Sequence, residues 1–313
     1  MSKLETPSVS LPALGASKAV LISARPKQWT KNLLVFLALI FSFNEGWSFS
    51  DAEQIANVVQ KSAFVFILFC ALSSAVYIFN DITDIEKDRL HPIKKLRPIP
   101  SGRLSLSTAW LTAIILTAVS LILSLVTEPL LGCVSAGYTV LMVLYSRWTK
   151  NVVLLDVFSI SGGFVLRAVA GAVALTIPIS PWLYSCTSLG ALLIALGKRR
   201  SELSIAGDLA PDQRVSLQSY SLHLIDKITA IVAPLTLLTY TLYALTASNL
   251  PDNHAMALTI PFVVFGLFRY LFMVYKKNLG EAPEDIFLTD IPLILSNSAW
   301  IVTASTILIV YRA

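Results

Sequence analysis

The chain of 313 residues is 55% hydrophobic and only 14% charged, with a formal net charge of +5. This composition excludes an ordinary water-soluble globular domain, in which about a quarter of the residues are charged. The basic residues are spread over several loops instead of forming one patch, so we expect no nucleic-acid partner.

The first segment, residues 1–20, is polar and contains Pro7, Pro12 and Gly15. It lacks the basic start, apolar middle and cleavage site of a signal peptide. We therefore expect a disordered cytoplasmic tail, followed by one transmembrane domain over residues 21–313.

Long apolar runs follow, each near the length of about 20 residues that a helix needs to cross a bilayer. The runs are continuous and lack the alternation of barrel strands, which excludes a membrane barrel. The sequence therefore predicts an all-α, polytopic membrane bundle of about nine transmembrane helices. Their expected ranges are 31–45, 62–80, 106–127, 130–146, 152–174, 182–197, 228–247, 257–275 and 294–311.

Basic residues precede the first run and recur in the loops after the second, fourth, sixth and eighth runs. The turns at 127–130, 176–181 and 248–254 carry no Lys or Arg. The positive-inside rule places the basic loops and the amino terminus in the cytoplasm and Ala313 on the other side. We expect an integral protein of a bacterial-type inner membrane, with any chemistry of the basic loops facing the cytoplasm.

An acidic run lies at the cytoplasmic end of the second predicted helix and comprises Asn80, Asp81, Asp84 and Asp88. If the helix continues, this spacing places the side chains on adjoining strips of one face. Clustered carboxylates need a compensating cation, and Mg²⁺ accepts a few such oxygens together with water and phosphate oxygens. The run predicts a Mg²⁺ site that binds a diphosphate. The alternative is a solvated loop helix, but ionisable groups beside a membrane helix are usually functional.

A basic segment follows directly, and its prolines prevent a regular helix. Its candidate ligands for phosphate are Arg89, Lys94, Lys95 and Arg97. These cations either bind phosphate beside the acidic run or anchor the loop to anionic lipid headgroups. We favour phosphate binding.

Three further polar residues lie in apolar surroundings. Arg167 would cost about 2.5 kcal/mol or more if it faced lipid at mid-bilayer, so we expect it inside the bundle, bound to a substrate phosphate or to a carboxylate such as Asp156. Asp156 could also orient a cation or a sugar hydroxyl, and Tyr77 could bind substrate or lie at the membrane interface. Small residues expected to allow close helix packing are Gly162, Gly163 and Gly171.

The pattern Asn-Asp-x-x-Asp-x-x-x-Asp over residues 80–88, at the end of the second of nine helices, resembles the UbiA superfamily of intramembrane prenyltransferases, in which it binds Mg²⁺ and a diphosphate. The segments at 25–32, 89–102, 197–202 and 281–290 resemble the decaprenyl-phosphate phosphoribosyltransferase branch. The resemblance covers nearly all of the chain and implies a UbiA-like catalytic domain over residues 21–313.

One departure from the superfamily concerns its second acidic motif, expected after the sixth helix. This chain has Lys198, Arg199 and Arg200 there, with Glu202 as the nearest carboxylate. The basic residues are either a positive-inside anchor or a site for a second anion, and the replacement favours the second interpretation.

The resemblance implies transfer of a 5-phosphoribosyl group from phosphoribosyl pyrophosphate to a polyprenyl phosphate held in the lipid bilayer, with Asn80, Asp84 and Lys198 in catalytic roles. The alternatives are a prenyltransferase that uses a prenyl diphosphate and an aromatic acceptor, and a membrane transporter, which would show inverted repeats and broken helices. The sequence does not fix the oligomeric state. The expected substrate-binding residues are Lys31, Tyr77, Arg89, Lys94, Lys95, Arg97, Asp156, Arg167, Lys198, Arg199 and Glu202.

Overall fold

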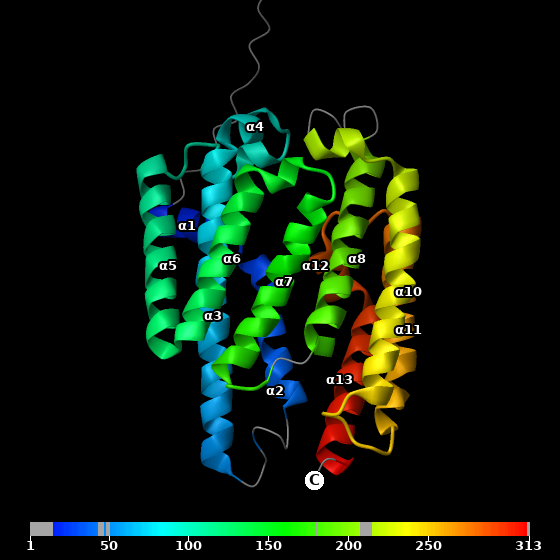
Figure 1. Cartoon of the computed structure of the whole chain (residues 1–313). Coiled ribbons are helices and arrows are strands. Elements are labelled where there is room, and N and C mark those ends of the chain that lie inside the picture. Colours follow the sequence, from blue (N-terminus) through cyan, green and yellow to red (C-terminus); the bar gives the residue numbers. More distant parts are fainter. Residues whose placement is uncertain (1–14, 43–46, 48–50, 179–180, 207–214, 312–313) are drawn as a thin grey trace, which may run out of the picture.

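The computed structural model describes residues 15–42, 47, 51–178, 181–206 and 215–311, which form an all-helical bundle (Figure 1). Within these ranges, seven helical segments are long and apolar enough to cross a membrane. They are α3 (Ala52–Thr83), α5 (Leu106–Thr127), α6 (Pro129–Arg147), α7 (Leu155–Ala174), α10 (Leu222–Thr246), the segment Ala255–Lys277 with η6 (Ala255–Thr259) and α11 (Ile260–Lys277), and α13 (Ile291–Tyr311). The predicted all-α membrane bundle is confirmed.

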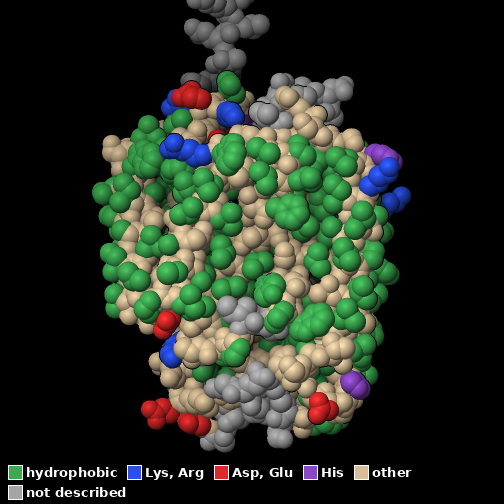
Figure 2. Space-filling view, in the orientation of Figure 1, with side chains coloured by type: hydrophobic (Ala, Val, Ile, Leu, Met, Phe, Trp, Pro, Cys, Tyr) green, Lys and Arg blue, Asp and Glu red, His purple; other side chains and the backbone are tan. Residues whose placement is uncertain are grey.

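The helix α8 (Pro181–Ala206) corresponds to the sixth predicted span and packs between α7 and α10. Its 26 residues correspond to about 39 Å of helix, which is enough to cross the hydrocarbon core. α3 and α7 are the most enclosed of the spanning helices, whereas α5 and α11 present most of their surface outward. Figure 2 shows hydrophobic side chains over the middle of the visible face and charged side chains toward its two ends.

The first predicted span, at 31–45, is not a regular α-helix. The chain instead forms the 3₁₀ helix η1 (Pro26–Phe36) and the short helix α2 (Leu37–Phe41). η1 packs closely against α7 at Gly171. A Cβ atom built on Gly171 would lie only 2.0 Å from the Val35 carbonyl oxygen. This contact confirms the packing role predicted for Gly171.

The helix α1 (Ala16–Ala24) begins inside the segment that we expected to be a disordered tail, and it packs against α3. Residues 1–14 lie outside the described part of the chain. α1 ends at Arg25, whose φ of 53° is in the left-handed region, and Pro26 then starts η1. This turn directs η1 into the bundle.

The basic loops around α4 (Ile85–Leu90), η2 (Lys94–Leu96) and η3 (Thr149–Asn151) lie at one end of the bundle, and the chain's carboxyl end lies at the other (Figure 1). This arrangement agrees with the predicted alternation of basic and uncharged loops. The remaining short elements are η5 (Val215–Ser219) and α12 (Pro283–Thr289). α12 contacts both α13 and η1, so it joins the two ends of the sequence.

Candidate functional site

The acidic run does not form one continuous helix. α3 ends at Thr83, Asp84 is a joint with φ −101° and ψ 11°, and α4 starts at Ile85. Asp88 therefore belongs to a separate helix from Asn80 and Asp81. In the part of the chain that the structure describes, no three Asp, Glu, His or Cys side chains come together as metal ligands. The expected convergence of four ligands is not seen.

Each of the three aspartates has a basic partner instead. Arg25 and Arg97 both pair with Asp81, which is 2% exposed, and Arg97 Nη1 also lies 2.7 Å from Asp88 Oδ2. Arg97 thus lies beside the acidic run, as we expected of the basic segment. Arg25 is a partner that the sequence did not identify, because it lies 56 positions from Asp81.

Lys150 is the partner of Asp84. Its Nζ atom lies 2.7 and 2.6 Å from the two Asp84 carboxylate oxygens. Lys150 is held by η3, where Ser216 Oγ donates a hydrogen bond of 2.9 Å to its backbone carbonyl oxygen. Sequence reasoning placed Lys150 in a basic loop and missed its contact with the acidic run.

The other expected cations of the basic segment lie farther from the aspartates. Arg89 pairs with Glu86 at 3.1 Å and donates to the Pro100 carbonyl oxygen at 3.4 Å. Lys94 and Lys95 lie in η2, and Lys95 is exposed. Their phosphate contacts remain predictions.

Two oxygens of the acidic run suit Mg²⁺. The Asn80 Oδ1 atom is buried and has no hydrogen-bond partner among the described residues. Asp84, four residues later, is partly exposed. Mg²⁺ commonly takes one or two protein oxygens and completes its octahedron with water and substrate phosphate. The chemistry of Asn80 and Asp84 fits that requirement: Asp84 pairs with Lys150 but is the most exposed of the three aspartates, whereas Asp81 and Asp88 are buried against arginines.

Tyr77 lies one helical turn before Asn80 in α3. The Arg25 guanidinium carbon is 5.0 Å from the centre of its ring. The structure therefore places Tyr77 beside the acidic run, among the cations that surround Asp81.

A second group of charged residues comprises Lys31 of η1, Lys198 of α8 and Glu284 of α12. Lys31 Nζ donates to Gln28 Oε1 and lies 3.6 Å from Glu284 Oε2. Lys198 is close enough to Lys31 and Glu284 for their charges to interact, and it forms no hydrogen bond or ion pair with another described residue. We refer to Lys31, Lys198 and Glu284 as the lysine cluster.

Glu284 was not predicted, although it lies in the segment 281–290 that carries part of the family resemblance. Its side chain is 12% exposed, and Gln28 Nε2 donates to its Oε1 atom. Burial alone would raise the pKa of the Glu284 carboxyl, but Lys31, the Gln28 hydrogen bond and Lys198 together hold it below its ordinary value. Glu284 is therefore ionised at neutral pH.

The loop before α12 is fixed on α8. Gly280 N donates to Ser201 Oγ at 3.0 Å, and a Cβ atom on Gly280 would lie 2.6 Å from the Gly197 carbonyl oxygen. Only a residue without a side chain allows this approach. The contact places α12 beside Lys198, the residue that follows Gly197.

Arg199 and Asp156 form a buried ion pair, each at 0% exposure. Arg199 Nε donates to Asp156 Oδ2 at 2.7 Å, and Arg199 Nη1 donates to Glu202. Tyr220 donates its hydroxyl to Asp156 Oδ1 at 2.8 Å. Arg199 thus joins Asp156 and Glu202 within the protein, and the substrate contacts expected of these three residues remain predictions.

Arg167 lies inside the bundle at 4% exposure, as predicted. It donates hydrogen bonds of 2.7 Å each to Asn32 Oδ1, the Gly163 carbonyl oxygen and the Tyr138 hydroxyl. The alternative pair with Asp156 is excluded, because Asp156 pairs with Arg199. The hydrogen-bond partners of Arg167 within the described ranges are all neutral, so no carboxylate matches its charge there.

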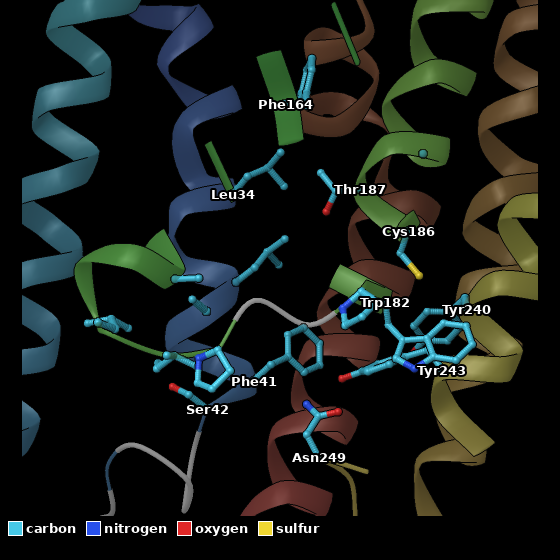
Figure 3. Close-up of a pocket in the computed structure, with 18 of the residues that line it drawn as sticks. Leu34, Phe41, Ser42, Phe164, Trp182, Cys186, Thr187, Tyr240, Tyr243 and Asn249 are labelled. Atoms are coloured by element: carbon cyan, nitrogen blue, oxygen red, sulfur yellow. The ribbon is translucent and has the colours of Figure 1, made fainter. Parts of the chain in front are cut away.

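A cavity of about 1040 Å³ lies between α2, α7, α8, α10 and α13. Its lining is mainly apolar, with Leu34 and Phe164 toward one end and Trp182, Tyr240 and Tyr243 at the other (Figure 3). At the aromatic end, Trp300 Nε1 donates to the Tyr240 hydroxyl at 2.6 Å. The cavity is large enough and apolar enough for a hydrocarbon ligand.

Comparison with known proteins gives a consistent result. Residues 47–289 match the family model of the UbiA prenyltransferase family. The decaprenyl-phosphate phosphoribosyltransferase of Mycobacterium tuberculosis is 32% identical over 295 residues, which are 94% of this chain and 96% of that protein. The protein of the same name from Mycolicibacterium smegmatis is 34% identical over 298 residues, covering 92% and 91% of the two chains.

The fold also matches solved structures. A UbiA homolog from Archaeoglobus fulgidus, bound to DMAPP and Mg²⁺, superimposes with a TM-score of 0.70 at 18% sequence identity. The match covers 93% of this chain and 99% of that one. The two proteins share their helical architecture.

Proposed function

Because the chain belongs to the UbiA prenyltransferase family, we propose that it transfers a 5-phosphoribosyl group from phosphoribosyl pyrophosphate to a polyprenyl phosphate and releases diphosphate. Relatives that match nearly the whole chain carry the name decaprenyl-phosphate phosphoribosyltransferase. The product would be a lipid-linked pentose phosphate, a precursor for the cell envelope.

The observation that carries this proposal is that each of three cations, Lys31, Lys198 and Arg167, is next to a residue that lines the apolar cavity. Leu34 lines the cavity three residues after Lys31 in a 3₁₀ helix, so the two side chains share a face. Ile194 lines it four residues before Lys198, one turn away in α8. A third lining residue, Phe164, has its ring centre 5.4 Å from the guanidinium carbon of Arg167.

This arrangement suits an amphiphile with a long hydrocarbon chain and an anionic head. The chain would occupy the cavity, and the phosphate would lie among Lys31, Lys198 and Arg167. Arg167 and Lys198 have no carboxylate hydrogen-bonded to them within the described residues, so a phosphate would supply the missing charge.

The acidic run would bind the second anion. Asn80 and Asp84 would hold Mg²⁺, which when bound neutralises charge on a diphosphate leaving group. Lys150 pairs with Asp84, Arg25 and Arg97 pair with the other aspartates of the acidic run, and all three cations would contact the diphosphate as well. Two separate anion sites favour two phosphorylated substrates over the alternative, in which one prenyl diphosphate carries both the anion and the hydrocarbon.

The reaction requires few groups of the protein. An oxygen of the polyprenyl phosphate forms a bond to C1 of the ribose, and the bond from C1 to the diphosphate oxygen breaks with the electron pair leaving on the diphosphate. The phosphate monoester is already ionised at neutral pH, so no strong base is needed. Lys31, Lys198 and Arg167 orient the attacking oxygen, and we expect one displacement with inversion at C1 and no covalent enzyme intermediate.

The distribution of the basic loops supports a cytoplasmic position for the site. We propose that the acidic run and the lysine cluster face the cytoplasm of a bacterial cell, where the water-soluble donor is available. The acceptor would reach the same site from within the bilayer.

The test is an assay of purified protein in lipid vesicles with ribose-labelled phosphoribosyl pyrophosphate, polyprenyl phosphate and Mg²⁺. We expect label in the lipid phase, reduced by about 100-fold or more in Asp84→Asn and in Lys198→Met. Lys276→Met, at the end of α11, removes a basic residue away from both anion sites and should keep the parent rate. Absence of lipid-linked label, together with turnover when a prenyl diphosphate and an aromatic acceptor are supplied instead, would contradict the proposal.

A further inference from the structure

Glu284 carries a buried carboxylate oxygen that no described residue satisfies. Its Oε1 atom accepts a hydrogen bond from Gln28, but its Oε2 atom has no hydrogen-bond partner. The nearest cation, Lys31 Nζ, is 3.6 Å from Oε2, which is an ion-pair distance and too long for a hydrogen bond. A buried acceptor without a donor costs about 1–3 kcal/mol, and more if it is charged. Buried polar atoms in folded proteins are almost always hydrogen-bonded, so an unsatisfied carboxylate oxygen indicates a functional role.

The position of Glu284 is fixed from two sides. Gly280 holds the loop before α12 against Ser201 and Gly197 of α8, and Gln28 holds the carboxylate itself from η1. The side chain therefore cannot turn outward to water without losing the Gln28 bond and the Lys31 pair. The unsatisfied oxygen is held in place beside Lys31 and Lys198.

A partner for Glu284 Oε2 must donate a hydrogen bond and cannot be an anion. Phosphate oxygens of the proposed substrates are ionised and would be repelled by a carboxylate, while the neighbouring lysines attract them. The only neutral donors that phosphoribosyl pyrophosphate offers are the two vicinal hydroxyls of its ribose. A prenyl diphosphate with a plain isoprenoid chain offers none.

We infer that Glu284 accepts a hydrogen bond from a ribose hydroxyl of the donor and thereby selects a phosphoribosyl donor over a prenyl diphosphate. This inference rests on the proposed function and assigns to it a specificity residue. A site built around such an acceptor discriminates strongly, because a ligand without the hydroxyl leaves the carboxylate buried and unsatisfied. Glu284 thus acts in donor binding, and it takes no proton during the displacement.

The experiment compares two stable ligands, ribose 5-phosphate and 2,3-dideoxyribose 5-phosphate, as competitors of the labelled donor in binding to the purified protein with Mg²⁺. The parent protein should prefer ribose 5-phosphate by roughly 10-fold to 100-fold, the value of a hydrogen bond to a charged acceptor. Glu284→Met should reduce this preference to less than about threefold. Asp285→Asn, which removes the neighbouring exposed carboxylate of α12, should keep it.

The ratio of the two affinities separates recognition from a general structural effect. A merely structural Glu284 would lower the affinity for both sugar phosphates equally and leave the ratio unchanged. Binding of Mg²⁺-diphosphate to each variant verifies that the acidic run is intact. An equal preference in the parent and in Glu284→Met overturns the inference and leaves the proposed function standing. Absence of Mg²⁺-dependent binding of the labelled phosphoribosyl pyrophosphate itself removes the proposed donor, and the inference with it.

Discussion

Lys198 and Arg199 are neighbours in α8, but only Arg199 has ion-pair partners within the described protein. The same substitution, to Met, should therefore lower stability at Arg199 and lower activity at Lys198. Arg199 is fully buried and bonds Asp156 and Glu202. Arg199→Met would leave the buried Asp156 carboxylate with Tyr220 as its remaining side-chain partner in the described chain. Removing one member of a buried ion pair costs about 3–5 kcal/mol, so we expect a loss of that size in the free energy of unfolding.

Lys198→Met should differ from Arg199→Met in its effect on stability and in its effect on activity. Lys198→Met removes no hydrogen bond or ion pair to another described residue, and it removes a half-buried ammonium whose charge is unmatched, so the free energy of unfolding should stay the same or rise. Its activity should fall, because the ammonium is assigned to the acceptor phosphate. Denaturant titration of the two purified variants and of the parent in detergent measures the difference in the free energy of unfolding. An Arg199→Met variant as stable as the parent would refute the assignment of Arg199 to internal packing.

Three further predictions concern packing, the cavity and pH. Gly171→Ala should destabilise the protein by about 1–3 kcal/mol in the same unfolding assay, because the new Cβ atom would overlap the Val35 carbonyl, whereas Gly137→Ala meets open space and should be tolerated. Gly190→Leu extends a side chain into the cavity and should raise KM several-fold for long-chain but not short-chain polyprenyl phosphates in steady-state kinetics. The pKa of Glu284 is below its ordinary value, so its contribution to stability is complete above that value and is lost as the pH falls through the folded-state pKa. The difference in unfolding free energy between the parent and Glu284→Gln should therefore be constant from about pH 8 to 5 and shrink below; a difference that grows on acidification would contradict the carboxylate's ionised state.

The sequence was sufficient to predict the helical bundle and the position of the acidic run, because both depend on local patterns. It did not predict the break at Asp84, since no Gly or Pro lies between Asn80 and Leu90. It also did not predict that the first apolar run forms a 3₁₀ helix. This 3₁₀ segment makes a tertiary contact, the close approach of Val35 to Gly171, which local sequence patterns do not reveal.

The roles of Arg199 and Glu284 depend on partners far away in the chain. Arg199 binds Asp156, 43 positions earlier, and Glu284 meets Gln28, 256 positions earlier. Locally, Glu284 resembles an acidic residue in the first turn of a helix, where it would be favoured for electrostatic reasons alone. Only the folded arrangement distinguishes the unpaired Lys198 from the paired Arg199 beside it.

The central claim is that the donor supplies a phosphoribosyl group and the lipid is the acceptor. The most direct measurement offers the purified protein both phosphoribosyl pyrophosphate and a prenyl diphosphate, with polyprenyl phosphate, an aromatic acceptor and Mg²⁺, and identifies the products by mass spectrometry. The proposed function predicts a polyprenyl phosphate that has gained one phosphoribosyl group, together with free diphosphate. A prenylated aromatic product, with the polyprenyl phosphate unchanged, would contradict it.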